Sequence, residues 1–224
     1  MSPLFRNRRD AGRALASNLL TNSNVTTEPV VLALPRGGVP VAFEVAGRFR
    51  APLDVCIVQR LEVPGSAGVV MGAIASERVL VLLSSVIDEL GVPEKDVTRI
   101  VRKQARELSR RERAYRGEQA AVSLAGRTVI LVDDGLASLA TPITAIAAIR
   151  ARRPERIVFA TPVAHAESYR GLLGLVDGLV CLEMPIPFHS VGEWYSDFSS
   201  VSDLDVRRLH GDAVERARHW SFPH

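Results

Sequence analysis

Short apolar runs that alternate with helical patterns constrain the fold of this chain more than any other feature. Six runs rich in valine, isoleucine and leucine are predicted strands: Val30–Leu34, Leu53–Val58, Val79–Leu83, Thr128–Val132, Arg156–Ala160 and Gly178–Leu182. Several are apolar on both faces, which is typical of strands covered by helices on each side of a sheet. Helical patterns fall between most of them, at Pro40–Phe49, Glu94–Arg116, Pro142–Arg152 and Ala166–Leu175. This order predicts right-handed crossovers and an α/β fold with a mainly parallel, doubly wound sheet.

Two segments depart from this alternation. The runs Val69–Ala75 and Val79–Leu83 are separated by only three residues, which predicts an antiparallel hairpin on the sheet. The tail Glu183–Phe198 is dense in proline and aromatic residues, so we expect it to be packed rather than disordered. A final helix, roughly Asp203–Ala217, is predicted after the N-cap candidate Ser202.

Composition limits the class of protein. The chain has 224 residues, of which 47% are hydrophobic and 24% charged, and a net charge of +3. That balance tolerates phosphate ligands without requiring nucleic acid. Cys56 and Cys181 both lie in apolar runs, which favours core thiols in a reducing compartment. No signal peptide or membrane-spanning run is visible, so we expect a cytoplasmic protein.

Two adjacent carboxylates, Asp133 and Asp134, follow the strand Thr128–Val132 and precede a loop of small residues. Ligands of open parallel sheets bind beyond the carboxyl ends of the strands. A small-residue loop before a helix can direct several backbone N–H groups at one anion. The neighbouring carboxylates would then hold sugar hydroxyls or Mg²⁺. Taken alone, the motif is about as typical of these alternatives as of a sugar-phosphate site: a solvated strand end, or the acidic pocket of a receiver-like domain.

A second loop follows the first predicted strand. Gly37 and Gly38 permit positive φ angles and close backbone approach to a ligand, and Arg36 can clamp phosphate oxygens. The alternative is an ordinary turn between a strand and a helix.

A hydrophobic strand, two acids and a small-residue loop that ends in threonine resemble the phosphoribosyl pyrophosphate signature of type I phosphoribosyltransferases. Further segments resemble a subgroup of predicted phosphoribosyltransferases of unsettled substrate: V-L-A-L-P-R-G-G-V-P-V-A-F-E-V-A, A-P-L-D-V, M-G-A-I-A, R-R-E-R-A-Y-R-G, and P-F-H-S-V-G-E-W-Y-S-D-F with V-S-D. They cover nearly the whole chain in the expected order.

The resemblance implies one phosphoribosyltransferase-like domain over residues 1–224, with a core of about residues 25–182. Residues 183–224 and the N-terminal segment would form a small hood. It also implies phosphoribosyl pyrophosphate binding by a set of loop residues: Arg36, Gly37, Gly38, Asp133, Asp134, Gly135, Leu136, Ala137, Ser138, Leu139, Ala140 and Thr141.

Roles for individual residues follow from the same resemblance. The catalytic set would be Asp133, Asp134, Arg36 and Arg60, and the two aspartates would hold the ribose hydroxyls directly or through Mg²⁺. The expected reaction transfers the phosphoribosyl group to a nitrogenous, nucleobase-like acceptor. The expected ligand is phosphoribosyl pyrophosphate or a nucleoside monophosphate. An aromatic group in the tail could stack on the acceptor, or could be a hydrophobic cap with no ligand role: Phe188, His189, Trp194 and Tyr195.

Some positions depart from the family pattern. Family members typically carry glycine where this chain has Leu139. If that position needs a positive φ, leucine costs about 1–2 kcal/mol; if the backbone is helical, the side chain can point away. Gln59 replaces a cation, and the loop that ends at Gly68 lacks an acidic residue. The alternative function is therefore a catalytically degenerate homologue that senses a nucleotide or binds RNA.

The segment Arg99–Arg116 contains eight cations and two acids along one predicted helix. A solvated face is the default interpretation of such a helix. The excess charge could also attract polyanionic substrates, or bind RNA phosphates as some regulatory relatives do, through Arg99, Arg102, Lys103, Arg106 and Arg110. Relatives often dimerise, so the resemblance also suggests a homodimer.

Overall fold

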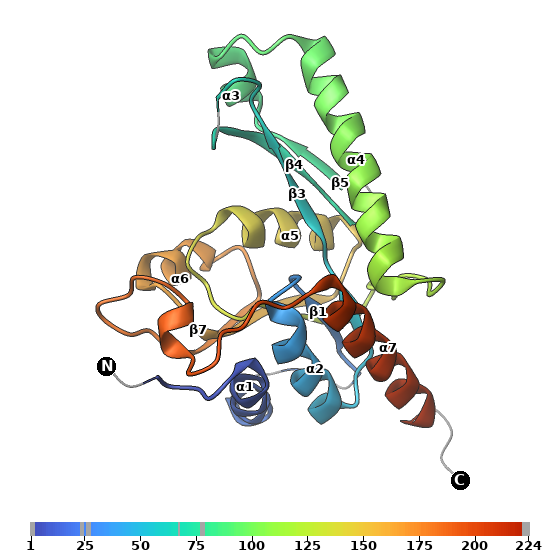
Figure 1. Ribbon diagram of the computed structural model, residues 1–224, viewed down its shortest axis with the longest axis vertical. Coiled ribbons are helices and arrows are strands. Elements are labelled where there is room, and N and C mark those ends of the chain that lie inside the picture. Colours follow the sequence, from blue (N-terminus) through green and yellow to red (C-terminus); the bar gives the residue numbers. More distant parts are fainter. Residues whose placement is uncertain (1–2, 23–24, 26–27, 67, 77–78, 221–224) are drawn as a thin grey trace.

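A five-stranded parallel sheet forms the centre of the protein, as the computed structural model of residues 3–22, 25, 28–66, 68–76 and 79–220 shows (Figure 1). Its strand order is β2-β1-β6-β7-β8. The strands are β1 (Val30–Ala33), β2 (Leu53–Val55), β6 (Thr128–Val132), β7 (Arg156–Val163) and β8 (Gly178–Glu183). The predicted α/β fold with a mainly parallel sheet is confirmed.

Helices cover both faces of this sheet. One face carries α1 (Arg8–Asn22), α2 (Gly38–Phe49) and α7 (Asp203–Trp220), and the other carries α5 (Ala140–Ala151) and α6 (Ala166–Leu172). Alternate strand residues enter the two cores: Val31 packs toward α1 and α2, whereas Leu32 packs toward α5 and α6. Burial on both faces explains why the strand sequences are continuously apolar.

The predicted hairpin is present, but it lies on a second sheet rather than on the main one. Three antiparallel strands form this sheet: β3 (Val58–Glu62), β4 (Val70–Ala75) and β5 (Val79–Leu82). The predicted strand Leu53–Val58 is split, because the chain leaves the main sheet after Val55 and enters β3 at Val58. With α3 (Ser84–Glu89) and α4 (Glu94–Arg116), the second sheet projects from the core as an arm (Figure 1).

The helix α4 lies along this arm, and the apolar side of the helix faces the strands of the arm. Val97, Leu108 and Tyr115 are buried at helical spacing, and the helix contacts β3, β4 and α7. The opposite side keeps its charged residues in solvent.

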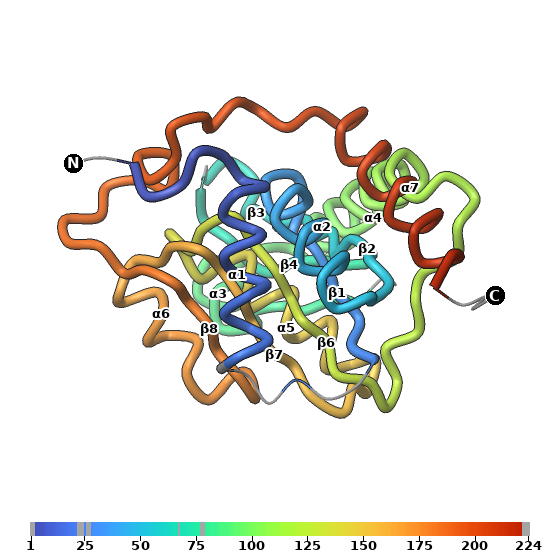
Figure 2. The backbone as a smooth tube through the Cα atoms, turned by 90° about the horizontal axis from the view of Figure 1, so that it is seen from below, coloured from blue at the N-terminus to red at the C-terminus, as the bar shows by residue number. Residues whose placement is uncertain are grey.

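The N-terminal segment and the tail lie side by side (Figure 2). Phe5 forms an isolated bridge with Tyr195, and its backbone amide donates to the carbonyl of Trp194. These aromatic residues pack together with Ala11 and Val163, and Trp194 ends the 3-10 helix η2 (Gly192–Trp194). The tail is packed, as predicted. In the part of the chain that the structure describes, no helix combines the length and apolarity needed to cross a membrane.

Candidate functional site

A pocket of about 470 Å³ opens at the carboxyl ends of β1 and β6, and we call it the carboxylate pocket. Both loops singled out in the sequence border it. Its lining comprises Arg8, Leu34, Pro35, Arg36, Gly37, Asp133, Asp134, Gly135, Ala137, Ser138, Thr141, Pro142, Phe198, Ser200 and Val201. Two loops far apart in sequence therefore converge because β1 and β6 are neighbours in the sheet.

The two glycines allow this convergence. A Cβ atom at Gly38 would lie 2.7 Å from the carbonyl oxygen of Val132, and one at Gly37 would collide with the carboxylate of Asp134. Gly37 has a φ of −62°, so close approach between the loops, and not a positive φ, accounts for glycine there. Gly38 packs behind the pocket rather than lining it.

The acidic pair has distinct environments. Asp133 Oδ1 accepts a hydrogen bond of 2.9 Å from the backbone amide of Asp134, and Asp134 Oδ2 pairs with Arg8 Nε at 2.7 Å. Burial, together with the charge of Asp134, raises the pKa of Asp133 well above its usual range. A cation or further hydrogen-bond donors beside Asp133 would be needed to favour its ionised form.

Arg8 is a site residue that the sequence analysis did not identify. Its guanidinium lies 3.7 Å from the ring centroid of Phe198, and its Nη1 donates to the carbonyl of Ser199 at 2.8 Å. Arg8 therefore connects α1, the tail and Asp134. The N-terminal arginines were visible in the sequence, but nothing local indicated which of them reaches the acidic pair.

The loop before α5 has the geometry of an anion site. Within the described residues, no hydrogen-bond acceptor pairs with the backbone amides of residues 138–141, and Pro142 follows in the first turn of α5. Free N–H groups at a helix N-terminus attract an oxyanion. The hydroxyls of Ser138 and Thr141 border the same pocket.

Leu139 does not enter the carboxylate pocket. Its φ of −91° and ψ of −19° are right-handed helical, so the positive-φ penalty does not arise. Its side chain packs toward α6, where a Cβ on Gly171 would collide with Leu139 Cδ1. Leu136 is fully buried in the same core, and Ala140 does not line the pocket.

A second hollow of about 390 Å³, which we call the arginine pocket, adjoins the first through Leu34, Pro35, Arg36 and Thr141. The end of α4 contributes Arg110, Arg111 and Tyr115 to its lining. Arg36 Nη1 lies 3.7 Å from Asp203 Oδ1, which also accepts a 2.8 Å hydrogen bond from the Tyr115 hydroxyl. Arg36 thus stands between an acidic hollow and a basic one.

Other predicted site residues lie outside both pockets. Arg60 is exposed on β3. Trp194 and Tyr195 are buried, and the Tyr195 hydroxyl donates to the backbone carbonyl of Asp134. Phe188 packs near His165, with ring centroids 5.6 Å apart, and His189 is exposed. The carboxylate pocket is bordered instead by Phe198, at the end of the tail, and by Ser200 and Val201, which follow it.

The carboxylates of the pocket meet the needs of a divalent cation only in part. Among the described residues, no group of three or more His, Cys, Asp or Glu side chains converges. Asp133 and Asp134 provide two adjacent carboxylates. Mg²⁺ commonly binds through one or two carboxylates and completes its shell with waters and substrate phosphates, so this pair fits Mg²⁺ that arrives with a phosphorylated ligand.

Comparison with known proteins identifies the family of the chain. A family model described as "Phosphoribosyl transferase domain" matches residues 5–191. Two curated relatives from Mycobacterium tuberculosis strains, "Putative phosphoribosyl transferase MT0597" and "Putative phosphoribosyl transferase Rv0571c", are each 39% identical over 216 residues, or 95% of this chain. That match covers 48% of each relative, so the chain spans about half the length of these curated relatives.

A solved structure extends the comparison to the fold. The crystal structure of TT1426 from Thermus thermophilus superimposes with a TM-score of 0.81 and 36% identity, over 93% of this chain and 98% of the other. From the family match and these relatives we conclude that the chain belongs to the phosphoribosyl transferase domain family.

Proposed function

We propose that the protein binds phosphoribosyl pyrophosphate with Mg²⁺ and transfers the phosphoribosyl group to a nitrogenous, nucleobase-like acceptor. One observation supports this most directly: free amides at the start of α5 and the carboxylates of Asp133 and Asp134 border one pocket, from which Leu139 is turned away.

Each part of the ligand has a chemical partner in this proposal. The amides of residues 138–141 would hold the 5′-phosphate. Asp133 and Asp134 would hold the ribose hydroxyls, directly or through the metal. Arg36, at the junction with the arginine pocket, would bind the pyrophosphate with its fork of donors. Arg8 would have to share or release Asp134 when the ligand enters.

The chemistry requires positioning rather than a covalent intermediate. As pyrophosphate leaves, C1 of the ribose would gain positive charge and the acceptor nitrogen would bond to it, while Asp133 and Asp134 would hold the sugar ring. Bound Mg²⁺ would neutralise charge on the leaving group. Phe198, Ser200 and Val201 line the same pocket and would exclude water from the bound sugar.

Titration calorimetry tests the binding step. We expect heat when phosphoribosyl pyrophosphate is added with Mg²⁺, and at least tenfold weaker binding by Asp133→Asn. Asp212→Asn on the exposed side of α7 makes the same charge change and should bind like the wild type. A wild-type protein that gives no heat would remove the proposal.

A regulatory role is the second candidate, and the Arg8–Asp134 ion pair favours it because it neutralises one member of the acidic pair in the described conformation. A panel of nucleobases separates the two functions. A transferase releases pyrophosphate with at least one acceptor, whereas a nucleotide sensor binds the ligand and releases none.

A further inference from the structure

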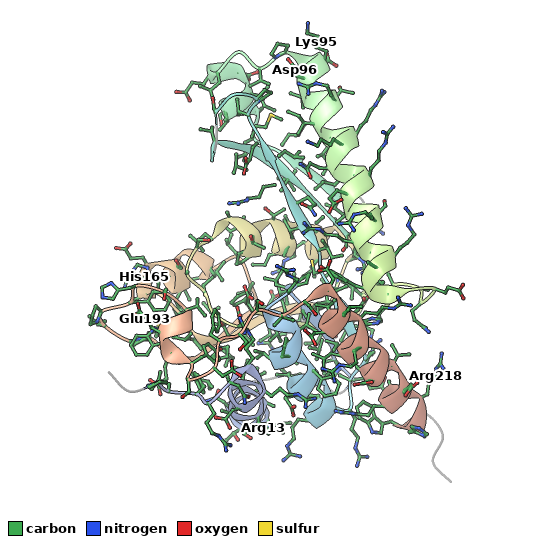
Figure 3. All side chains as sticks on the ribbon, in the orientation of Figure 1. Arg13, Lys95, Asp96, His165, Glu193 and Arg218 are labelled. Carbon is green, nitrogen blue, oxygen red and sulfur yellow. The ribbon has the colours of Figure 1, made fainter. Side chains whose placement is uncertain are left out.

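A third hollow, of about 810 Å³, runs beside α4 on the arm, and we call it the α4 groove. Its cations greatly outnumber its acids. The lining residues are Gln59, Lys95, Thr98, Arg99, Arg102, Lys103, Gln104, Arg106, Glu107, Arg110 and Arg111. Lys95 lies near the tip of the arm, far from the main sheet (Figure 3).

The cations form one row along the helix. Lys95, Arg99, Arg102, Arg106 and Arg110 follow one another at intervals of three or four residues, which places them on one helical face. At 1.5 Å per residue, the row is about 22 Å long. Such a row matches an extended polyanion and is longer than a single nucleotide can cover.

Much of this charge has no partner in the part of the chain that the structure describes. Arg99 pairs with Asp96 at 2.8 Å, and Arg110 and Arg111 share Glu107 at 2.8 and 3.0 Å. For Lys95, Arg102, Lys103 and Arg106, no ion pair is found within the described residues. Like charges one helical turn apart destabilise a helix, so the row has a cost that internal contacts do not offset.

We infer that the α4 groove binds the phosphate backbone of single-stranded nucleic acid without sequence preference. A single row of cations matches the single row of phosphates on one nucleic-acid strand, whereas a duplex presents two rows of phosphates. Among the described residues that line it there is no aromatic side chain on which bases could stack, so phosphates would provide the binding energy. Gln59 lines the groove from β3, and its buried Nε2 has no hydrogen-bond partner among the described residues.

This site is separate from the proposed transferase pocket, although they meet at one end. Arg110 and Arg111 line both the α4 groove and the arginine pocket. Strand binding can be measured with no phosphoribosyl pyrophosphate present, so failure of one proposal leaves the other standing.

Fluorescence anisotropy with 5′-labelled, mixed-sequence RNA and DNA, each about 15 nucleotides long, tests the inference. The groove shows nothing that distinguishes the two sugars, so we expect similar affinities for both. The plot of log K against log salt should have a slope of about −3, as expected for about four or five neutralised phosphates.

The decisive variant is Arg102→Ala/Lys103→Ala/Arg106→Ala, which removes three exposed cations and should weaken strand binding at least tenfold. Arg48→Ala/Arg170→Ala/Arg208→Ala removes three exposed cations elsewhere and should change binding less than twofold. Circular dichroism melts confirm that both variants fold.

Three results would overturn the inference. The first is no strand binding by the wild type at low salt. The second is equal loss of binding in the two triple variants, which would reduce the effect to net charge. The third is equally tight binding of a duplex or of polyglutamate, which would indicate another class of partner.

Discussion

At the scale of single residues, the side chain of Leu139 and the absence of a side chain at Gly171 fit together. Leucine is acceptable at position 139 because its backbone is right-handed helical, and Gly171 leaves the space on α6 that the leucine side chain fills. From the sequence, two outcomes for Leu139 were open. The choice depended on a contact with a residue on another helix, which the loop's own sequence does not contain.

A double-mutant cycle tests this pairing. We expect Leu139→Gly to lower the free energy of unfolding by about 1–3 kcal/mol, since it removes a half-buried side chain and loosens the backbone. Gly171→Ala should destabilise because its Cβ collides with Leu139, and Leu139→Ala should restore most of that loss. Urea melts give the energies. Tenfold tighter ligand binding by Leu139→Gly would instead show that leucine obstructs the pocket.

At the scale of elements, a buried ion pair attaches the arm to the core. Asp54 on β2 is 1% exposed, and its Oδ1 lies 2.7 Å from Arg116 Nε at the end of α4. The backbone amide of Val122 donates to its other oxygen at 3.1 Å, and His210 Nε2 of α7 lies 3.6 Å away. Asp54 belongs to the segment A-P-L-D-V and Arg116 to R-R-E-R-A-Y-R-G, so the ion pair gives these two family-like segments a structural role.

Removal of the Asp54 carboxylate should leave the buried charge of Arg116 without its main partner. We expect Asp54→Asn to lower stability by about 3–5 kcal/mol, measured by urea unfolding at pH 7. Asp212→Asn, at an exposed position, should change it by less than about 0.5 kcal/mol. A loss below about 1 kcal/mol for Asp54→Asn would show that Arg116 finds other partners.

The same pair predicts a pH dependence. Burial by itself would raise the pKa of Asp54, but His210, Arg116 and the Val122 amide lower it to about 2. A lowered pKa adds stability above the unfolded-state value near 4, and this is lost as pH falls toward 2. Between pH 6 and pH 3 the wild type should lose about 1 kcal/mol more than Asp54→Asn. Parallel urea melts at the two pH values check this.

Elements were predictable where apolar periodicity decides them, and less so where long-range contacts do. The main-sheet strands and α4 follow from their patterns. The break after Val55 was missed because the run stays apolar through Ile57, which is buried where the chain turns into the arm. Helix α1 was also missed: Ala11, Leu15 and Leu19 have helical spacing but lie among arginines and polar residues.

The site residues also differ in how far the sequence predicts them. The two loops were predictable because each carries its own chemistry beside a strand. Arg8 and Phe198 reach the pocket only through tertiary packing. Trp194 and Tyr195 looked suited to stack on a ligand, but they serve the core beneath the tail.

At the scale of the whole molecule, the arm and the core share a charged boundary. Arg110 and Arg111 line the α4 groove on one side and the arginine pocket on the other. A strand in the groove and pyrophosphate beside Arg36 would therefore draw on the same two cations, so the two proposed sites should be coupled.

Competition measures this coupling. We expect about 1 mM pyrophosphate to weaken strand binding by about threefold to tenfold beyond sodium chloride of equal ionic strength, since it occupies two of the row's cations. In Arg110→Ala/Arg111→Ala, strand binding should be weaker and no longer respond to pyrophosphate. Equal effects of pyrophosphate and sodium chloride on the wild type would show that the sites are independent.

The contact between Arg8 and Phe198, at the end of the tail, affects when the pocket forms during folding. Arg8 donates to the carbonyl of Ser199, 191 positions away, and both Arg8 and the neighbouring Phe198 must be in place before the pocket has its full wall. A nascent chain whose sheet has formed but whose tail has not docked lacks that wall. We therefore expect binding of the proposed ligand to require the docked tail, so that mild unfolding of the tail abolishes binding while the helices and strands persist.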